Sequence, residues 1–366
     1  MSSEVRQQNT PSTSDSANLH TSNRRLFLLS VVTVIFAALV ALFWRETTNL
    51  FLFRRFFGSS SGVAASSLTK SVSAPVVTSS SIAEQPGYKM KTPVYFFSHG
   101  GPNIMFDVEH PAHKKLGQIG REITTKVKPR AVVVFSAHWQ GGRDTVYVNT
   151  AENTDLIYDF YGFPGHYYKE QYPNVGSKEV SHKVLDALKE AGIDAKGVKR
   201  GLDHGVWVSF KCAFEPDSNP LNVPVVQVSL FDTEDPNQHY RLGQAVARLR
   251  EENILIIVSG MAVHNLRDLR FTFGDPRPMP YSVSFDEALK DAATKPPAER
   301  QQALADLLKR PDARQAHPTF DHLLPIHIGA GAAQEDVGKR IWTFPEGSMS
   351  WAQFRFGELN NASTSL

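Results

Sequence analysis

"AVVVFSAHW", residues 131–139, contains a continuous run of apolar, mostly β-branched side chains that ends at Phe135 and is followed by two small residues and a histidine. An apolar run of this length without alternation is typical of a strand that is buried on both faces, as in the parallel sheets of α/β proteins. Three further stretches have the same character, at residues 94–97, 223–230 and 253–260.

Segments with helical periodicity separate these strands. They have apolar residues three and four positions apart, and they cover residues 110–127, 177–192 and 239–252. Gly192 is the last residue of the second of them, as expected for a helix C-terminus. Because strands and helices alternate along the chain, we expect an α/β fold with a mostly parallel central sheet and helices on both faces.

Composition narrows the function classes. The 39 basic and 37 acidic side chains leave a formal net charge of +2, which gives no general attraction to nucleic acid. One cysteine, Cys212, excludes an intramolecular disulfide and a cysteine-based zinc site. Any metal must therefore be bound by His, Asp or Glu, and the chain has 13 histidines.

The N-terminal quarter differs from the rest. Residues 1–23 are polar without periodicity and are predicted to be a disordered tail. Residues 24–45, "RRLFLLSVVTVIFAALVALFWR", contain an uncharged apolar core of the length of a membrane-spanning helix. We therefore expect a single-pass membrane protein anchored by this segment, with a cleaved signal or organellar targeting as alternatives.

The remaining domain boundaries follow from composition. The Ser-rich residues 46–91 are typical of a flexible linker, residues 92–357 are predicted to be the catalytic or binding domain, and residues 358–366 a flexible tail.

Three histidines follow predicted strands within a few residues: His99, His138 and His264. The carboxyl ends of parallel strands meet at one edge of a sheet, where α/β proteins bind ligands, so these side chains should converge on one cleft. A single histidine at such a position is most often structural, but three at equivalent positions favour a chemical role. His204, His317, His322 and His327 are further candidates.

The predicted donor set indicates the kind of metal. Imidazoles with few carboxylates suit Fe(II) or Zn(II) and disfavour Mg²⁺ and Ca²⁺, which prefer oxygen. Because the histidines are spread along the chain, a protease with two histidines on one helix is disfavoured. Asp321 and His322 are adjacent, and spacing alone does not decide which of them binds metal.

Seven motifs in order resemble the class III extradiol ring-cleavage dioxygenases, in particular the DOPA 4,5-dioxygenase branch. The motifs are "SHGGP", "SAHW", "IYDFYGFPGHYY", "RGLDHGVW", "VPVVQVSL", "SGMAVHNLR" and "HPTFDHLLP", between residues 98 and 325. The resemblance implies that His99, His138 and His322 bind the metal, and that His264 is a further ligand or an acid/base beside it. Gly101 and Tyr158 depart from the family pattern, which usually has Ser and His there.

The resemblance also implies a reaction. A catechol and O2 would be the substrates, Fe(II) the metal needed for turnover, and Zn(II) a possible bound ion. We expect His264 and His204 to transfer protons, and Tyr158, Asp159 and Phe160 to contact the substrate from a loop over the cleft. The bond broken would lie next to the two hydroxyl-bearing carbons, and the product would be a semialdehyde.

Two other functions remain open from the residues alone. Three histidines can hold a zinc ion that activates water, so a zinc hydrolase is the main alternative. The other is a membrane-tethered metal-binding protein without catalytic activity. Oxygen uptake with a catechol distinguishes both from a dioxygenase.

Overall fold

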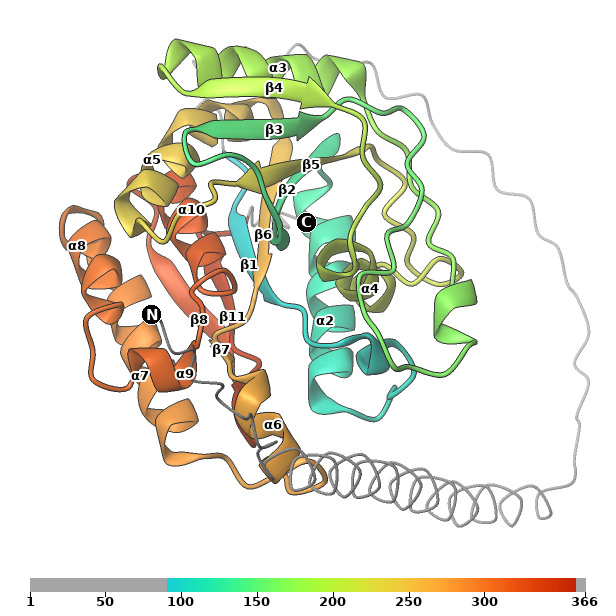
Figure 1. The fold of residues 1–366 in the computed structure, drawn as a ribbon. Helices are drawn as coiled ribbons and strands as arrows, with labels where there is room; N and C mark the ends of the chain where they lie inside the picture. The colour runs from blue at the N-terminus through green and yellow to red at the C-terminus, as the bar shows by residue number, and fades with distance from the viewer. Residues whose placement is uncertain (1–90, 360–366) are drawn as a thin grey trace, which may run out of the picture. The chain divides into compact units, whose positions relative to one another are not determined.

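The computed structural model describes residues 91–359 (Figure 1). The predicted tail 1–23, the apolar segment 24–45, nearly all of the linker 46–91 and residues 360–366 lie outside the described residues. The domain boundaries at 92 and 357 stay predictions.

An eight-stranded sheet forms the centre of the described region, in the order β4-β3-β5-β2-β6-β1-β11-β8 (Figure 1). Its strands are β1 (Val94–Ser98), β2 (Ala131–Gln140), β3 (Thr145–Asn149), β4 (Asp194–Val198), β5 (Val225–Leu230), β6 (Ile254–Gly260), β8 (Gly338–Trp342) and β11 (Gln353–Phe356). A small second sheet, β7-β10-β9, contains Val263–His264, Met349–Ser350 and Pro345–Glu346.

The sheet is mixed. The central strands β5, β2, β6 and β1 are parallel, as the apolar runs predict. However, β11 is antiparallel to β1 and to β8, and β3 is antiparallel to β5. The expectation of a mostly parallel sheet therefore describes the centre, whereas the added outer strands make the whole sheet mixed.

Helices cover both faces of the sheet, which confirms the predicted α/β architecture (Figure 1). Alternate residues of β1 show the two layers, since Val94 and Phe96 pack on one side and Tyr95 and Phe97 on the other. Helices α2 (Pro111–Glu122) and α4 (His204–Ala213) cover the second side. The first side is covered by α3 (Lys178–Glu190), α5 (Pro236–Val246) and α10 (Leu324–Ala333).

The remaining helices lie between β7 and α10 in the chain. They are α6 (Leu266–Thr272), α7 (Pro280–Ala293), α8 (Pro297–Leu307) and α9 (Ala313–Ala316).

The predicted membrane localisation is corrected by the lengths of these helices. Between residues 91 and 359, every helix is too short or too polar to cross a bilayer. The longest helix there, α7, has 14 residues, which corresponds to about 21 Å and is well short of a hydrocarbon core of about 30 Å. The prediction of a single-pass membrane protein is contradicted on this finding, and the segment 24–45 that suggested it lies outside the described residues.

Candidate metal centre

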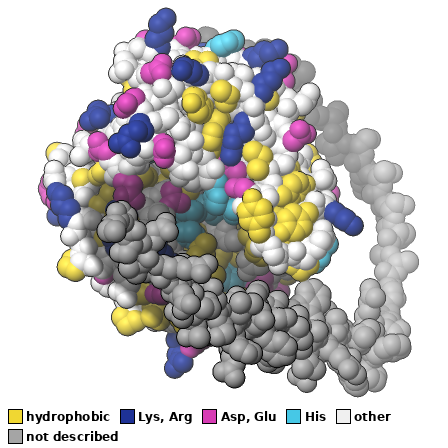
Figure 2. Space-filling model, in the orientation of Figure 1, with side chains coloured by type: hydrophobic (Ala, Val, Ile, Leu, Met, Phe, Trp, Pro, Cys, Tyr) yellow, Lys and Arg dark blue, Asp and Glu magenta, His cyan; other side chains and the backbone are white. Residues whose placement is uncertain are grey.

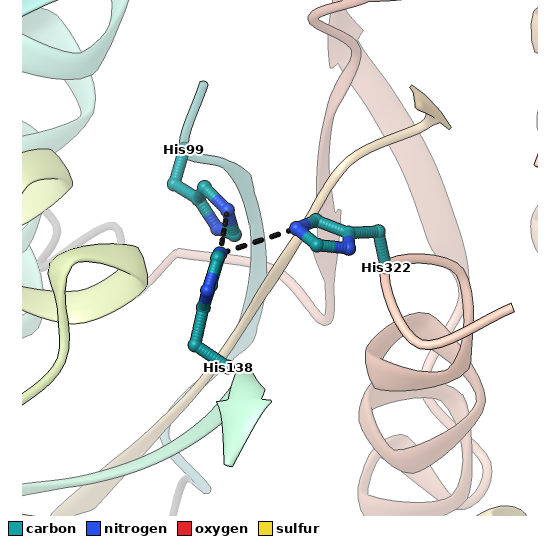
Figure 3. Close-up of side chains that lie close together, drawn as sticks. All are labelled: His99, His138 and His322. Atoms are coloured by element: carbon teal, nitrogen blue, oxygen red, sulfur yellow. Dashed lines mark hydrogen bonds between the residues drawn. The ribbon is translucent and has the colours of Figure 1, made fainter. Parts of the chain in front are cut away.

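Three histidines from distant parts of the chain converge at the carboxyl edge of the sheet (Figure 3). His99 directly follows β1, His138 lies on β2, and His322 lies in the turn before α10. Nε2 of His138 is 3.2 Å from Nε2 of His99 and 3.2 Å from Nε2 of His322. Figure 2 shows histidine side chains in a hollow of the surface.

The end of β6 holds two of these histidines in place. The backbone N–H of His99 donates to the carbonyl of Gly260 at 3.0 Å, and Met261 N–H donates to the carbonyl of His322 at 3.0 Å. A Cβ on Gly260 would lie 2.2 Å from that carbonyl oxygen of His322. Glycine is therefore required where the His322 turn crosses the strand.

His138 lies on a strand, whereas the sequence predicted it in a turn after the strand. The predicted strand ends near Phe135, but β2 continues to Gln140 with an irregular register against β5 after Phe135. Such an irregularity turns a side chain away from its regular alternation, and here it occurs where the strand reaches the site.

The hydrogen bonds of the three rings determine which nitrogen is free. Nδ1 of His99 donates to Ser259 Oγ at 2.9 Å, because that hydroxyl itself donates to the Gly205 carbonyl at 2.5 Å. Nδ1 of His138 donates to Asp159 Oδ2 at 3.1 Å, and Nδ1 of His322 donates to Asp321 Oδ2 at 2.7 Å. Each ring therefore presents an unprotonated Nε2 to the common centre.

This donor set fits a transition-metal ion. The lone pair on Nε2 of His138 lies 3.2 Å from each of the other two Nε2 atoms, and such lone pairs repel one another unless a cation lies between them. Metal–nitrogen bonds of about 2.05 Å at angles between 90° and 109° separate the nitrogens by about 2.9–3.4 Å, which includes the observed distances.

Burial keeps two of the ligands neutral, as metal binding requires. Burial, followed by the neighbouring histidines, lowers the pKa of His99 far below its usual value, and burial also lowers the pKa of His322. For His138, burial would lower the pKa, but the hydrogen bond to Asp159 and nearby carboxylates raise it on balance. A bound cation would oppose that protonation.

His264 lies beside the three-histidine group and outside it. It is on β7, and its ring stacks on the ring of His322 with centroids 3.6 Å apart and an interplanar angle of 13°. Burial lowers its pKa far below the usual value. This position suits the acid/base alternative for His264 better than the ligand alternative.

His204 lies on the other side of the group, at the start of α4. Its ring centroid is 4.1 Å from that of His138. Nδ1 of His204 donates to Asp159 Oδ1 at 2.8 Å, and its backbone N–H donates to the same oxygen at 2.9 Å. Burial lowers the pKa of His204, although the bond to Asp159 opposes this.

Two carboxylates near His204 have different partners. Asp203, its neighbour in the sequence, accepts from Ser136 at 2.7 Å and from Arg200 at 2.9 Å. Asp159 joins His138 to His204, and its predicted contact with the substrate stays a prediction. No local pattern predicts the contacts of Asp203 with Ser136 and of Asp159 with His204, because these partners lie 67 and 45 residues apart.

Tyr158 and Phe160 flank Asp159 with different roles. The hydroxyl of Tyr158 donates to the Glu170 carbonyl at 2.6 Å, and its ring lies against Trp207. Phe160 is buried, and its ring meets His204 edge-on at 5.6 Å. Phe160 thus forms a wall of the site, whereas Tyr158 packs behind it.

His317 and His327 are buried and do not belong to the three-histidine group. Nε2 of His317 bonds to the Ala262 carbonyl at 2.9 Å, and Nε2 of His327 bonds to the Leu304 carbonyl at 3.2 Å. Burial lowers the pKa of each to about 4, so both are neutral structural residues.

Comparison with known proteins agrees with this geometry. Residues 93–354 match the family described as the catalytic LigB subunit of aromatic ring-opening dioxygenase. The chain is 35% identical over 270 residues to a 4,5-DOPA dioxygenase extradiol of Beta vulgaris, an alignment that covers 72% of this chain and 95% of that protein. It is 31% identical over 271 residues to a protein of the same description from Escherichia coli K12, covering 73% and 95%.

A solved structure also resembles the fold. An uncharacterised protein of Escherichia coli K12 superimposes with a TM-score of 0.59 at 26% identity, and the match covers 73% of this chain and all of that one.

Proposed function

This chain belongs to the LigB family of aromatic ring-opening dioxygenases, and from that premise we propose that it cleaves a DOPA-like catechol next to its two hydroxyls, using Fe(II) bound by His99, His138 and His322. The convergence of three unprotonated Nε2 atoms carries this proposal. Both atoms of O2 enter the product, a ring-opened semialdehyde.

Iron supplies electron transfer between catechol and O2, which zinc, without redox chemistry, does not. The chain's own residues supply the proton transfers. His264 and His204 are neutral because they are buried, so each can accept a proton from a catechol hydroxyl and return it during bond cleavage. Asp159 binds Nδ1 of His204 and leaves its Nε2 as the accepting atom.

The surroundings of the histidines suit an aromatic substrate. Phe160 offers an apolar surface beside His204, and Trp207 is fully buried behind it. These side chains exclude water from one side of the centre. Exclusion of water strengthens the electrostatic interactions that hold a charged catechol.

The activity test is oxygen uptake by the full chain, loaded anaerobically with Fe(II) and supplied with L-DOPA or 4-methylcatechol. We expect one O2 per catechol and a yellow product only in the iron sample, with a zinc-loaded sample as the control. Iron that is bound without any oxygen uptake would contradict the proposal and favour the zinc hydrolase.

A pocket with charged side chains on its walls supports a substrate with a charged side chain. It has a volume of about 610 Å³ and borders the site at Asp321, the partner of His322. Charged side chains on its walls are Arg143, Asp232, Glu234 and Asp321. An ammonium and a carboxylate, as in an amino acid, would each find an opposite charge there.

We expect the substitution Arg143→Gln to raise KM for L-DOPA about threefold, because an exposed ion pair contributes up to about 1 kcal/mol. 4-Methylcatechol, which lacks the charged side chain, should be cleaved with an unchanged KM. An equal loss with both substrates would place the pocket outside substrate recognition.

A further inference from the structure

Asp159 contacts two histidines that have different tasks. Its Oδ2 accepts from Nδ1 of His138, a metal ligand in the proposed function. Its Oδ1 accepts two hydrogen bonds from His204, at 2.8 Å from Nδ1 and 2.9 Å from the backbone N–H. The three donors therefore share one carboxylate, and the other two metal ligands have no such shared partner among the described residues.

Both histidines depend on this carboxylate for the right tautomer. An imidazole that donates from Nδ1 has its lone pair on Nε2, which is the atom that binds metal or accepts a proton. Without an acceptor at Nδ1, the proton can move to Nε2 and block it. Asp159 is suited to both rings because its Oδ2 accepts from Nδ1 of His138 and its Oδ1 from Nδ1 of His204.

The carboxylate is itself held rigidly. Ile157, two residues before Asp159, donates its N–H to the Leu202 carbonyl at 2.7 Å and accepts from Trp207 Nε1 at 3.0 Å. Trp207 belongs to α4, the helix that begins with His204. The loop that contains Asp159 and the helix α4 are therefore fixed to each other close to the Asp159 carboxylate.

We propose that Asp159 is a positioning residue that sets the reactive nitrogen of both the ligand His138 and the proton-transferring His204, so that metal affinity and turnover depend on one carboxylate. This inference rests on the proposed function for the role of His204. The part that concerns metal binding by His138 depends on geometry alone.

Asp321 provides a matched comparison. It also accepts a hydrogen bond from Nδ1 of a ligand, His322, at 2.7 Å. Its other oxygen, Oδ1, is buried and has no hydrogen-bond partner among residues 91–359. Loss of its charge should therefore weaken metal binding without disturbing His204.

Three variants of the full chain separate the effect of Asp159 on metal binding by His138 from its effect on proton transfer by His204. In Asp159→Asn, the amide oxygen can still accept both bonds from His204, but the amide NH2 faces the Nδ1–H of His138. In Asp159→Ala, both histidines lose their acceptor. In Asp321→Asn, His322 alone is affected.

Two measurements are made on each variant: Zn(II) affinity by competition with a chromophoric chelator, and turnover of 4-methylcatechol at saturating Fe(II). We expect all three variants to bind Zn(II) about 10–100-fold more weakly, the usual effect of losing a carboxylate behind a ligand. At saturating iron, Asp159→Asn and Asp321→Asn should regain most of the turnover. Asp159→Ala should remain impaired because His204 is no longer held.

Each alternative outcome is informative. Unchanged Zn(II) affinity in both Asp159 variants would contradict the proposed effect of Asp159 on the ligand His138. Full turnover of Asp159→Ala at saturating iron would contradict its proposed effect on His204. If Asp159→Ala does not fold, as judged by thermal unfolding, Asp159→Asn still tests the metal half. Absence of catechol cleavage in the wild type would contradict the proposed function and leave the affinity results intact.

Discussion

Replacement of His99 by alanine is expected to lower metal affinity more than about 100-fold and to abolish oxygen uptake. Loss of a direct ligand should exceed the effect of about 10–100-fold seen when a supporting carboxylate is lost. The ring is almost completely buried, so solvent cannot take its place as readily as at the surface. The measurement is metal content after dialysis, together with affinity by chelator competition.

The free energy of unfolding provides a second measurement on His99→Ala. A ligand at 100 times its Kd stabilises a protein by about 2.7 kcal/mol. The wild type should show this gain on addition of metal, whereas His99→Ala at the same metal concentration should show almost none. His182→Ala, which removes an exposed histidine on α3, is the matched control and should behave as the wild type. Full metal occupancy in His99→Ala would refute the assignment of this ligand.

The central strands could be predicted from sequence because burial on both faces leaves a clear signal. Runs such as 131–135 have neither alternation nor charge, and the structure buries them completely. The outer strands have no such signal. In β4, residues Asp194–Val198 are mostly exposed, and β11 is a short strand with a buried arginine, Arg355. Pairing with a neighbouring strand, rather than local composition, places them in the sheet.

The site residues also divide into those whose position the strand pattern predicted and those for which it gave no signal. The positions of His99 and His138 after apolar runs indicate the edge at which they meet, since parallel strands end together. His322 comes from the turn before α10. It was one of several further candidates in the sequence, and only the resemblance to known dioxygenases selected it as a ligand. The structure brings these three together and leaves His264 stacked at the side. The assignment of ligand and acid/base roles stays a proposal.

The partners of the histidines could not be read from the sequence. Ser259 is 160 residues from His99, and Asp159 is 45 residues from His204. Nothing in the local pattern distinguishes Asp159 from the aromatic residues around it. These contacts decide which ring nitrogen is free, so the chemistry of the centre depends on the part of the structure that local patterns reveal least.

Gly205 offers a test of how closely the site is packed. It is the second residue of α4, where alanine would normally stabilise the helix by about 0.5–1 kcal/mol relative to glycine. A Cβ at this position would lie 2.7 Å from Cδ2 of His138, 2.8 Å from Ser136 Oγ and 3.2 Å from Cε1 of His99. Two of the three ligands would therefore have to move.

We expect Gly205→Ala to reduce turnover about 100-fold, because a displacement of about 1 Å in a catalytic site has an effect of this size. Metal affinity should fall as well, and unfolding should become easier by about 1–3 kcal/mol, the usual result of overpacking. Steady-state oxygen uptake, chelator competition and thermal unfolding measure these three quantities.

Gly117→Ala is the control for the helix effect. Gly117 lies within α2, and its nearest contact to a new Cβ would be the Cys212 carbonyl oxygen at 3.5 Å, an ordinary van der Waals distance. This variant should gain about 0.5–1 kcal/mol of stability and keep its activity. Both substitutions add one methyl group to a helix. If Gly117→Ala raises the free energy of unfolding and Gly205→Ala lowers it, the loss arises from the contacts of the new Cβ with the histidines. If Gly205→Ala were also stabilised and fully active, the ligands would have room that this geometry does not give them, and the tight packing inferred for the centre would be wrong.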